Sequence, residues 1–285
     1  MMRSVSEIML KNFRNINLLD GVKKAQDFVI NEGIDYFPVI DQKEIVGILT
    51  YRDLIKAHPN RIVADAMNDT IISISSSASI WEAKEIFDNN DIDAVLIIDN
   101  EELTGIITRN LLYAELGKHT DLLTGLYKTD YIYYHTRKLI SSKKNPAIIF
   151  IDVNNFGYID KKYGHIQGDI ILKEIASILK QSMNSETFLC RFGGDEFTIL
   201  TPYDLDRCIN FTKKILSKIS NYNFINNIKI NVSAGIALNS HEADCSDIIS
   251  IIYDLINRAS LASTKAKKEK HSYHIAEDDK VYSIS

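Results

Sequence analysis

One segment, FLCRFGGDEFTIL (residues 188–200), decides the fold of the second half of the chain. Strand-forming runs flank Gly193 and Gly194, so the pattern predicts a tight hairpin with a type I′ turn, whose two central residues both need positive φ. Asp195 and Glu196 follow the glycine pair directly. Carboxylates at an exposed hairpin tip can hold Mg²⁺ through their oxygens and face a triphosphate, which makes the tip a candidate site.

Upstream of this hairpin, an apolar run predicts a buried strand that starts at Ala147 and carries Asp152 at its end. Helices are expected near 130–140 and over 168–181. A carboxylate at the edge of a buried strand is costly unless it is paired or binds a metal. Asp152 is therefore a candidate metal ligand, and a solvated strand end is the alternative interpretation.

The first half of the chain is a tandem repeat with an offset of 58 residues, which lays residues 47–50 (GILT) on residues 105–108 (GIIT). A repeat of this kind means that one supersecondary unit is used twice, each copy covering the other's exposed face. The pattern of each copy predicts the order β-α-β-β-α. Helices are expected over 22–32 and 79–90, the latter after a cap signal at 75–77, and a linker to the second half within 110–120.

Residues 4–115 resemble a pair of CBS domains, a Bateman module, with repeats at about 4–58 and 62–116. In that family the cleft between the copies commonly holds an adenine nucleotide, contacted by the Thr and the Asp of a G-h-h-T-x-x-D pattern. Thr50 and Asp53 match this pattern, whereas the second copy keeps Thr108 but has Leu111 in place of the Asp. The T-x-x-D spacing is also typical of a helix cap, and both interpretations stay open.

Residues 121–280 resemble a GGDEF domain, the diguanylate cyclase fold. The resemblance rests on several blocks in order, namely D-x-L-T-G-L at 121–126, Y-G-H-x-x-G-D at 163–169, R-F-G-G-D-E-F at 191–197, V-S-A-G-I-A at 232–237 and Ala266-Lys267. It implies an α+β fold in which helices flank a central, mainly antiparallel sheet. In that family, two GTP molecules are joined into cyclic di-GMP with release of two pyrophosphates, and each domain binds one GTP, so an active unit is a homodimer.

The same resemblance implies roles for single residues. Asp152 and Asp195 would bind Mg²⁺ or Mn²⁺ with the carbonyl of Val153 nearby, and Glu196 would assist the metal or deprotonate the attacking 3′-hydroxyl. The GTP-binding set would comprise Asp169 and Asp160 at the guanine, Gly193 and Gly194 beside the phosphates, and Arg191 and Lys267 as phosphate-neutralising cations.

Several positions depart from the family pattern around the nucleotide. Asn154 replaces a second Asp, Gly157 replaces a phosphate-binding Lys, Asp160 replaces an Asn, and His271 replaces an Arg. The two charged positions of the product-inhibition motif hold Asn184 and Thr187. These departures keep two alternatives to a cyclase open, a nucleotide-binding sensor without turnover and a purely structural dimeriser.

The composition agrees with two ordinary globular domains, expected at 1–118 and 119–285. The 285 residues carry a net charge of −5, and 12 basic and 19 acidic residues in 1–120 leave 21 and 19 in 121–285, so neither half has the basic excess of a DNA- or RNA-binding protein. No apolar run is long enough for a membrane span, and the N-terminus lacks signal-peptide features, so we expect a cytoplasmic protein. The three cysteines, 190, 208 and 245, are expected to be buried and unpaired.

Overall fold

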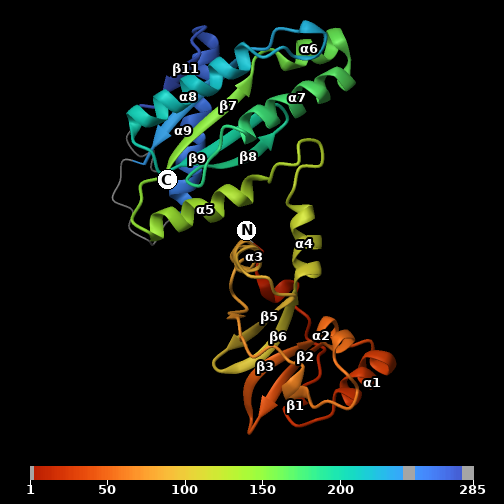
Figure 1. Ribbon diagram of the computed structural model, residues 1–285. Helices are drawn as coiled ribbons and strands as arrows, with labels where there is room; N and C mark the ends of the chain where they lie inside the picture. Colours follow the sequence, from red (N-terminus) through yellow and green to blue (C-terminus); the bar gives the residue numbers. More distant parts are fainter. Residues whose placement is uncertain (1–2, 240–247, 278–285) are drawn as a thin grey trace. The chain divides into compact units, whose positions relative to one another are not determined.

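The computed structural model describes residues 3–239 and 248–277, and the chain divides into two compact units, Met1–Lys118 and His119–Ser285. Figure 1 shows the elements of each unit along the sequence. Each unit has its own sheets and its own buried core, so the two are described separately.

The first unit confirms the predicted β-α-β-β-α repeat. The first copy contains β1 (Ile16–Asn17), α1 (Val22–Glu32), β2 (Tyr36–Asp41), β3 (Glu44–Thr50) and α2 (Tyr51–Lys56). The second copy contains β4 (Ser73–Ile74), α3 (Ile80–Asn89), β5 (Ala94–Asp99), β6 (Glu102–Thr108) and α4 (Arg109–Lys118). Short 3₁₀ turns, Val5–Glu7 and Val63–Asp65, precede the copies. Each copy forms one three-stranded sheet, with orders β1-β2-β3 and β4-β5-β6.

The two copies exchange their leading segments. Leu10, which precedes the first copy, pairs with Ile106 of β6, and Asn68, which precedes the second, pairs with Ile48 of β3. The approach is so close at Gly47 that a Cβ there would lie 2.5 Å from the carbonyl oxygen of Asn68. Each copy therefore completes the other, which is the physical reason for the repeated glycine.

The cap of α3 lies elsewhere than the sequence suggested. Ser79 is the N-cap, and its hydroxyl accepts a hydrogen bond from the main-chain N–H of Glu82 at 3.2 Å. The predicted cap at 75–77 is wrong, because Ser75 and Ser76 instead donate to Asp99 at 2.8 and 3.0 Å. Hydrogen bonds from Ser76 and Ser75 lower the pKa of Asp99 to about 2.

The segment 110–120, expected to be a helix-compatible linker that follows Thr108, is for the most part the helix α4. Leu112, Glu115 and Leu116 are buried on it, and the Glu115 carboxylate pairs with Arg3 and, at 2.8 Å, with Lys118. The pair with Arg3 holds the helix to the start of the first unit, whereas the pair with Lys118 lies within the helix itself.

The second unit is built on a five-stranded sheet with the order β11-β10-β7-β9-β8. Its elements are α5 (Thr129–Ser141), β7 (Ala147–Val153), α6 (Phe156–Tyr163), α7 (His165–Lys180), β8 (Phe188–Gly193), β9 (Glu196–Thr201), α8 (Leu205–Ser220), a 3₁₀ turn (Ile225–Asn227), β10 (Val232–Leu238), α9 (Ile248–Lys268) and β11 (Tyr273–Ile275). Within the described residues, β10 and β11 pair in parallel and the other neighbours are antiparallel, as predicted.

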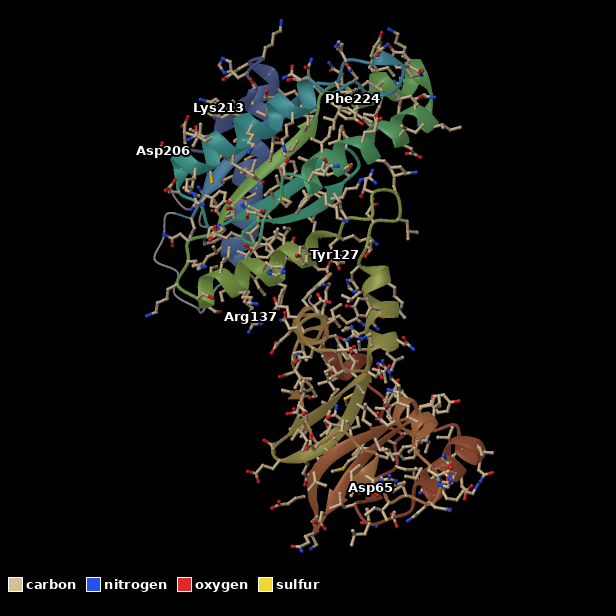
Figure 2. The ribbon with its side chains drawn as sticks, viewed as in Figure 1. Asp65, Tyr127, Arg137, Asp206, Lys213 and Phe224 are labelled. Atoms are coloured by element: carbon tan, nitrogen blue, oxygen red, sulfur yellow. The ribbon has the colours of Figure 1, made fainter. Side chains whose placement is uncertain are left out.

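The alternation of side chains along β7 divides the core of this unit. Ile149 and Ile151 pack with residues of α7 and α8, whereas Ile148 and Phe150 pack with residues of α5 and α9. Because the period of a strand is two, Asp152 points to the face that α9 covers. In Figure 2 the labels Asp206 and Phe224 mark the start of α8 and the segment that follows it. Cys190 and Cys208 are buried and unpaired as predicted, and Cys245 lies outside the described residues.

We predict that Gly235→Ala strongly destabilises the second unit. A Cβ at Gly235 in β10 would lie 1.9 Å from the carbonyl oxygen of Ala259 and 2.4 Å from the N of Ser263, both in the main chain of α9. The helix would have to move off the sheet, at a cost of about 1–3 kcal/mol or more.

Gly157→Ala is the matched control, because a Cβ at Gly157 in α6 would meet nothing within 4 Å. We expect it to leave the stability unchanged or to raise it by up to about 1 kcal/mol through helix propensity. Urea denaturation of the three proteins measures both effects, and an unchanged midpoint for Gly235→Ala would contradict the close packing of α9 on β10.

Candidate functional site

The hairpin between β8 and β9 is confirmed, but its turn differs from the prediction. Gly193 pairs with Glu196, so the two loop residues are Gly194 and Asp195, and of the two glycines only Gly194 has a positive φ, of 45°. The predicted type I′ turn, with both glycines in the left-handed region, is therefore wrong. Asp195 forms half of the turn, and this places its carboxylate at the very tip.

A Cβ on Gly193 would meet one atom within 4 Å, Oε2 of Glu196 at 3.9 Å. The interior of the protein therefore does not require glycine at this position. The open main chain at Gly193 is suited to the close approach of a ligand.

Strand register brings the predicted metal-binding residues together. Asp152 of β7 is the direct partner of Glu196 of β9, and directly opposed residues of antiparallel strands present their side chains on one face. The main-chain N–H of Val153 donates to the carbonyl oxygen of Asp195 at 3.3 Å, which ties the hairpin tip to the end of β7.

The ammonium of Lys267 lies among these acidic groups. Its Nζ is 2.6 Å from Oδ1 of Asp152 and 3.5 Å from the carbonyl oxygen of Val153. Lys267 comes from the last turn of α9, the helix that covers this face of the sheet. Two oxygens that the sequence assigned to a metal ion thus already converge on one positive charge.

The local electrostatics favour proton binding at the hairpin tip. Burial raises the pKa of Asp195, and the charge of Asp152 adds to that rise, while Lys267 opposes it. Burial likewise raises the pKa of Glu196, with further contributions from Asp152 and Asp195. A carboxylate whose pKa is raised toward neutrality is a better base, which suits the role predicted for Glu196.

The donor set fits a hard divalent cation. Mg²⁺ prefers oxygen ligands and is usually bound by one or two carboxylates together with substrate phosphates. Asp152, Asp195 and the carbonyl of Val153 offer that chemistry. Within residues 3–239 and 248–277, no group of three or more His, Cys, Asp or Glu side chains gathers in metal-binding geometry. The candidate site therefore depends on a main-chain oxygen and on ligand phosphates.

Arg191 has protein partners on both sides. Its Nε donates to the carbonyl oxygen of Gly194 at 2.9 Å, and its Nη1 donates to Oδ1 of Asp121 at 2.8 Å. Asp121 also accepts from the main-chain N–H and the hydroxyl of Thr124, at 2.8 and 2.6 Å. Burial favours a higher pKa for Asp121, but the bonds from Thr124 and Arg191 outweigh it and lower the pKa.

Asp121 and Thr124 were missed as site residues, although the block D-x-L-T-G-L contains both. Their contacts show that this block braces the turn through the Arg191 guanidinium, whose side chain is 12% exposed. The phosphate-binding role predicted for Arg191 has to be compatible with these bonds.

The two carboxylates predicted at the base lie on neighbouring helices. Oδ2 of Asp160 in α6 lies 3.0 Å from Nδ1 of His165 and accepts from it when that nitrogen carries the proton, while Oδ1 of Asp160 is buried without a hydrogen-bond partner among the described residues. A Cβ on Gly168 would lie 1.9 Å from that Oδ1, so glycine is needed beside it. Asp169 follows on α7 and is exposed.

Two positions that depart from the family pattern, Gly157 and His271, lack the Lys and Arg side chains of that pattern. Gly157 is exposed in the first turn of α6, and His271 is 65% exposed with its Nδ1 3.4 Å from Oε2 of Glu269. At the former inhibition motif, Asn184 and Thr187 close a neutral turn, in which the main-chain N–H of Asn184 donates to the Thr187 hydroxyl at 2.8 Å.

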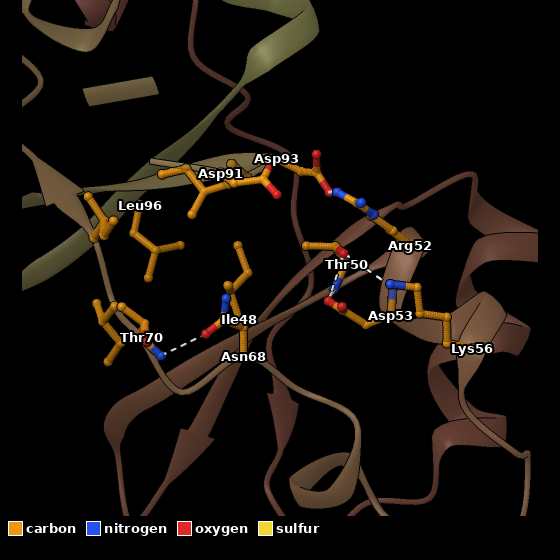
Figure 3. A pocket seen from close by; sticks show the side chains of 14 residues that line it. Ile48, Thr50, Arg52, Asp53, Lys56, Asn68, Thr70, Asp91, Asp93 and Leu96 are labelled. Atoms are coloured by element: carbon orange, nitrogen blue, oxygen red, sulfur yellow. Dashed lines mark hydrogen bonds and ion pairs between the residues drawn. The ribbon is translucent and has the colours of Figure 1, made fainter. Parts of the chain in front are cut away.

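The first unit contains a cavity of about 240 Å³ between its two repeats, shown in Figure 3. Its lining mixes apolar residues, among them Ile48, Ile92 and Leu96, with polar ones that include Thr50 and Asp53. Thr50 and Asp53 thus line the cavity, as expected of ligand-binding residues, and they also form a complete capping box at the start of α2. Oδ2 of Asp53 accepts from the N–H and the hydroxyl of Thr50 at 2.9 and 2.7 Å.

Charges from both repeats rim this cavity. Arg52 of the first repeat lies 3.8 Å from Asp93 of the second, and Lys56 and Asp91 are further lining residues. Thr108 is not among the lining residues; it is buried, and its hydroxyl accepts from the N–H of Leu111 at 3.2 Å. The two repeats are therefore unequal, and the cavity uses the first repeat's Thr and Asp.

Comparison with known families agrees with this division. The family described as "Diguanylate cyclase, GGDEF domain" matches residues 118–272, and the family described as "CBS domain" matches residues 5–60 and 63–116. The chain belongs to the GGDEF family, and two CBS domains precede its GGDEF domain. No helix among the described residues is both long and apolar enough to cross a membrane.

Individual relatives are similar over the second unit. The "Probable diguanylate cyclase DgcE" of Escherichia coli (strain K12) is 31% identical over 167 residues, which are 55% of this chain and 15% of the relative. "Diguanylate cyclase A" of Treponema denticola is 28% identical over 178 residues, 59% of this chain and 45% of the relative. The chain thus spans less than half the length of these relatives.

A solved structure shows the same fold for the second unit. It is the coiled coil and GGDEF domain of DgcB from Caulobacter crescentus in complex with c-di-GMP, with a TM-score of 0.50 and 17% identity. The match covers 59% of this chain and 89% of that chain.

Proposed function

We propose that this protein is a cytoplasmic diguanylate cyclase that joins two GTP molecules into cyclic di-GMP, regulated by an adenine nucleotide in its CBS pair. One observation carries the proposal, namely the convergence of Asp152 and the Val153 carbonyl on a single cationic position, with Glu196 directly opposite Asp152 in the sheet. The membership in the GGDEF family and the names of relatives support the same reaction.

The chemistry follows from the groups present. Mg²⁺ or Mn²⁺ held by Asp152, Asp195 and the Val153 carbonyl would neutralise the triphosphate and so assist attack at its α-phosphorus. Glu196, with its raised pKa, takes up the proton of the attacking 3′-hydroxyl, and pyrophosphate leaves. The open main chain of Gly193 and Gly194 admits the phosphates. Because each domain binds one GTP, a homodimer is required to bring two together.

Recognition of guanine is assigned to Asp169 and Asp160. Both accept hydrogen bonds and neither donates when ionised, which suits the N1–H and N2 amine of guanine and not adenine's N1. Among the described residues, Oδ1 of Asp160 has no internal donor, whereas Oδ2 lies 3.0 Å from Nδ1 of His165.

A second candidate function is a nucleotide sensor that binds GTP without condensing it. Two substitutions favour the sensor. Gly157 has no side chain where the family pattern has a Lys, and His271, which is exposed, replaces an Arg, so two cationic phosphate contacts of the pattern are missing. Loss of two such contacts lowers a rate by roughly 10²- to 10⁴-fold.

Regulation is assigned to the cavity between the CBS repeats. The apolar lining residues can contact an adenine ring, Asp53 can accept from ribose hydroxyls, and Arg52 and Lys56 can neutralise phosphate. The ligand would contact residues of both repeats at once and so favour one arrangement of the two repeats over others. A ligand regulates in this way only if it binds one conformation more tightly than another.

The first test is product analysis of the full chain with Mg²⁺ and GTP. We expect cyclic di-GMP from the natural protein and a fall of about 10²-fold or more for Glu196→Ala, because the base is lost. Chromatography against authentic cyclic di-GMP measures it. Glu186→Ala is the control, since Glu186 is an exposed carboxylate that pairs with Arg207 of α8 and not with the site residues. Bound GTP that is never converted would reject the cyclase in favour of the sensor.

Restoring the missing cations tests the second candidate. We expect Gly157→Lys combined with His271→Arg to raise product formation by about 10²-fold, since both positions are exposed and a Cβ at Gly157 meets nothing within 4 Å. Gly157→Gln with His271→Gln is the uncharged control. No gain over that control would show that the missing cations do not limit turnover.

The regulatory site is tested by thermal shift. We expect AMP or ATP to raise the melting temperature of the natural protein by a few degrees, and Asp53→Ala to abolish that rise, because its ribose acceptor is lost. Each protein is compared with itself without nucleotide, so a lower melting temperature caused by the missing capping box is present in both measurements and cancels. Asp65→Ala, at an exposed residue of the same unit, is the control. An undiminished shift in Asp53→Ala would remove Asp53 from the site.

A further inference from the structure

Lys267 stands out because it occupies the position that the proposed metal ion needs. Its ammonium contacts Oδ1 of Asp152 at 2.6 Å and faces the carbonyl oxygen of Val153 at 3.5 Å. These are two of the three ligands assigned to the metal. Its charge also opposes the rise in the pKa values of Asp195 and Glu196, so it is the counter-charge of the whole acidic group.

A divalent cation and this ammonium exclude each other. Mg²⁺ binds its ligand oxygens at about 2.0–2.1 Å and demands near-octahedral geometry. An ion that close to Asp152 and Val153 would lie within a few ångströms of Nζ, where like charges repel strongly in a partly buried site. Asp152 is 17% exposed, so water screens this repulsion only in part.

Lys267 can leave without disturbing the fold. Its main chain is held at the end of α9, where its carbonyl oxygen accepts from the N–H of Lys270 at 3.4 Å, but its side chain is 33% exposed and has a flexible four-carbon stem. It needs another anion as its partner once it leaves Asp152. The phosphate oxygens of a nucleoside triphosphate at the open main chain of Gly193 and Gly194 would supply one.

We propose that the ammonium of Lys267 occupies the position of the metal ion. It blocks metal binding there until a nucleoside triphosphate draws the ammonium away. The inference rests on the proposed metal ligands. Metal ion and triphosphate then bind with positive cooperativity, since each one removes an obstacle to the other, and the effect on the two affinities is equal by linkage. In this role Lys267 is a positioning residue that acts before any chemistry.

Direct metal binding tests this inference without turnover. The full chain is titrated with Mn²⁺, and the free ion is measured by electron paramagnetic resonance, with and without guanosine 5′-(α,β-methylene)triphosphate, whose α,β-bridge cannot be cleaved; the Mn²⁺ that the analogue binds without protein is subtracted. We expect weak Mn²⁺ binding by the natural protein alone and about tenfold or tighter binding with the analogue. For Lys267→Met, we expect the tighter binding without the analogue, and little further gain when it is added.

Two further variants keep the test decisive. Lys267→Gln keeps a polar side chain in case Lys267→Met unfolds, and melting curves show which proteins are folded. Lys265→Met removes a lysine of the same helix that pairs with Glu277 at 3.3 Å, and we expect it to behave as the natural protein does.

The outcomes separate the inference from the proposed function. Equal Mn²⁺ affinity of the natural protein and both folded Lys267 variants without the analogue overturns the inference and leaves the metal site in place. Absence of Mn²⁺ binding in every variant, with the analogue present as well, overturns the metal site and with it the proposed function. Tight binding by Lys267→Met alone, with the cooperativity lost, supports both.

Discussion

The register between β7 and β9 is the constraint on which the second unit depends. It sets Asp152 directly opposite Glu196 and brings Asp195 to the same end of the sheet, so three carboxylates meet in a partly buried place. Such a group repels itself and loses hydration on folding. The protein tolerates it because α9 packs closely enough on the sheet, over Gly235, to deliver the ammonium of Lys267.

The hairpin turn is held from the opposite side by a separate network. Arg191 joins the carbonyl of Gly194 to Asp121, which belongs to the segment that opens the second unit. Two cations therefore stabilise the turn region. Arg191 bonds its main chain, and Lys267 balances the charge of the carboxylates beside it. A Cβ at Gly194 would meet nothing within 4 Å, and one at Gly193 would meet only Oε2 of Glu196 at 3.9 Å, so this side of the main chain is open to a ligand.

The first unit solves a different problem, that of two small repeats which cannot cover their own cores. Exchange of the leading segments at Leu10 and Asn68 ties the copies together. The same exchange places the segment around Asn68 beside Thr50 and Asp53, so the cavity exists only because both repeats contribute to it. The two repeats differ at the equivalent positions Asp53 and Leu111. The carboxylate of Asp53 accepts a hydrogen bond from the N–H of Thr50, whereas the side chain of Leu111 cannot accept one from Thr108.

The sequence by itself determined what depends on local pattern: the β-α-β-β-α repeat, the strands around the glycine pair and the carboxylate at the end of β7. It did not determine the turn, because Gly194 and Asp195 became the loop only once Gly193 had paired with Glu196. Nor did it pair Lys267 with Asp152, 115 residues away, or Arg191 with Asp121, 70 residues away. Such contacts follow from how helices pack on a twisted sheet, and only the tertiary structure decides them, because the energy of a charge depends on which groups surround it in space.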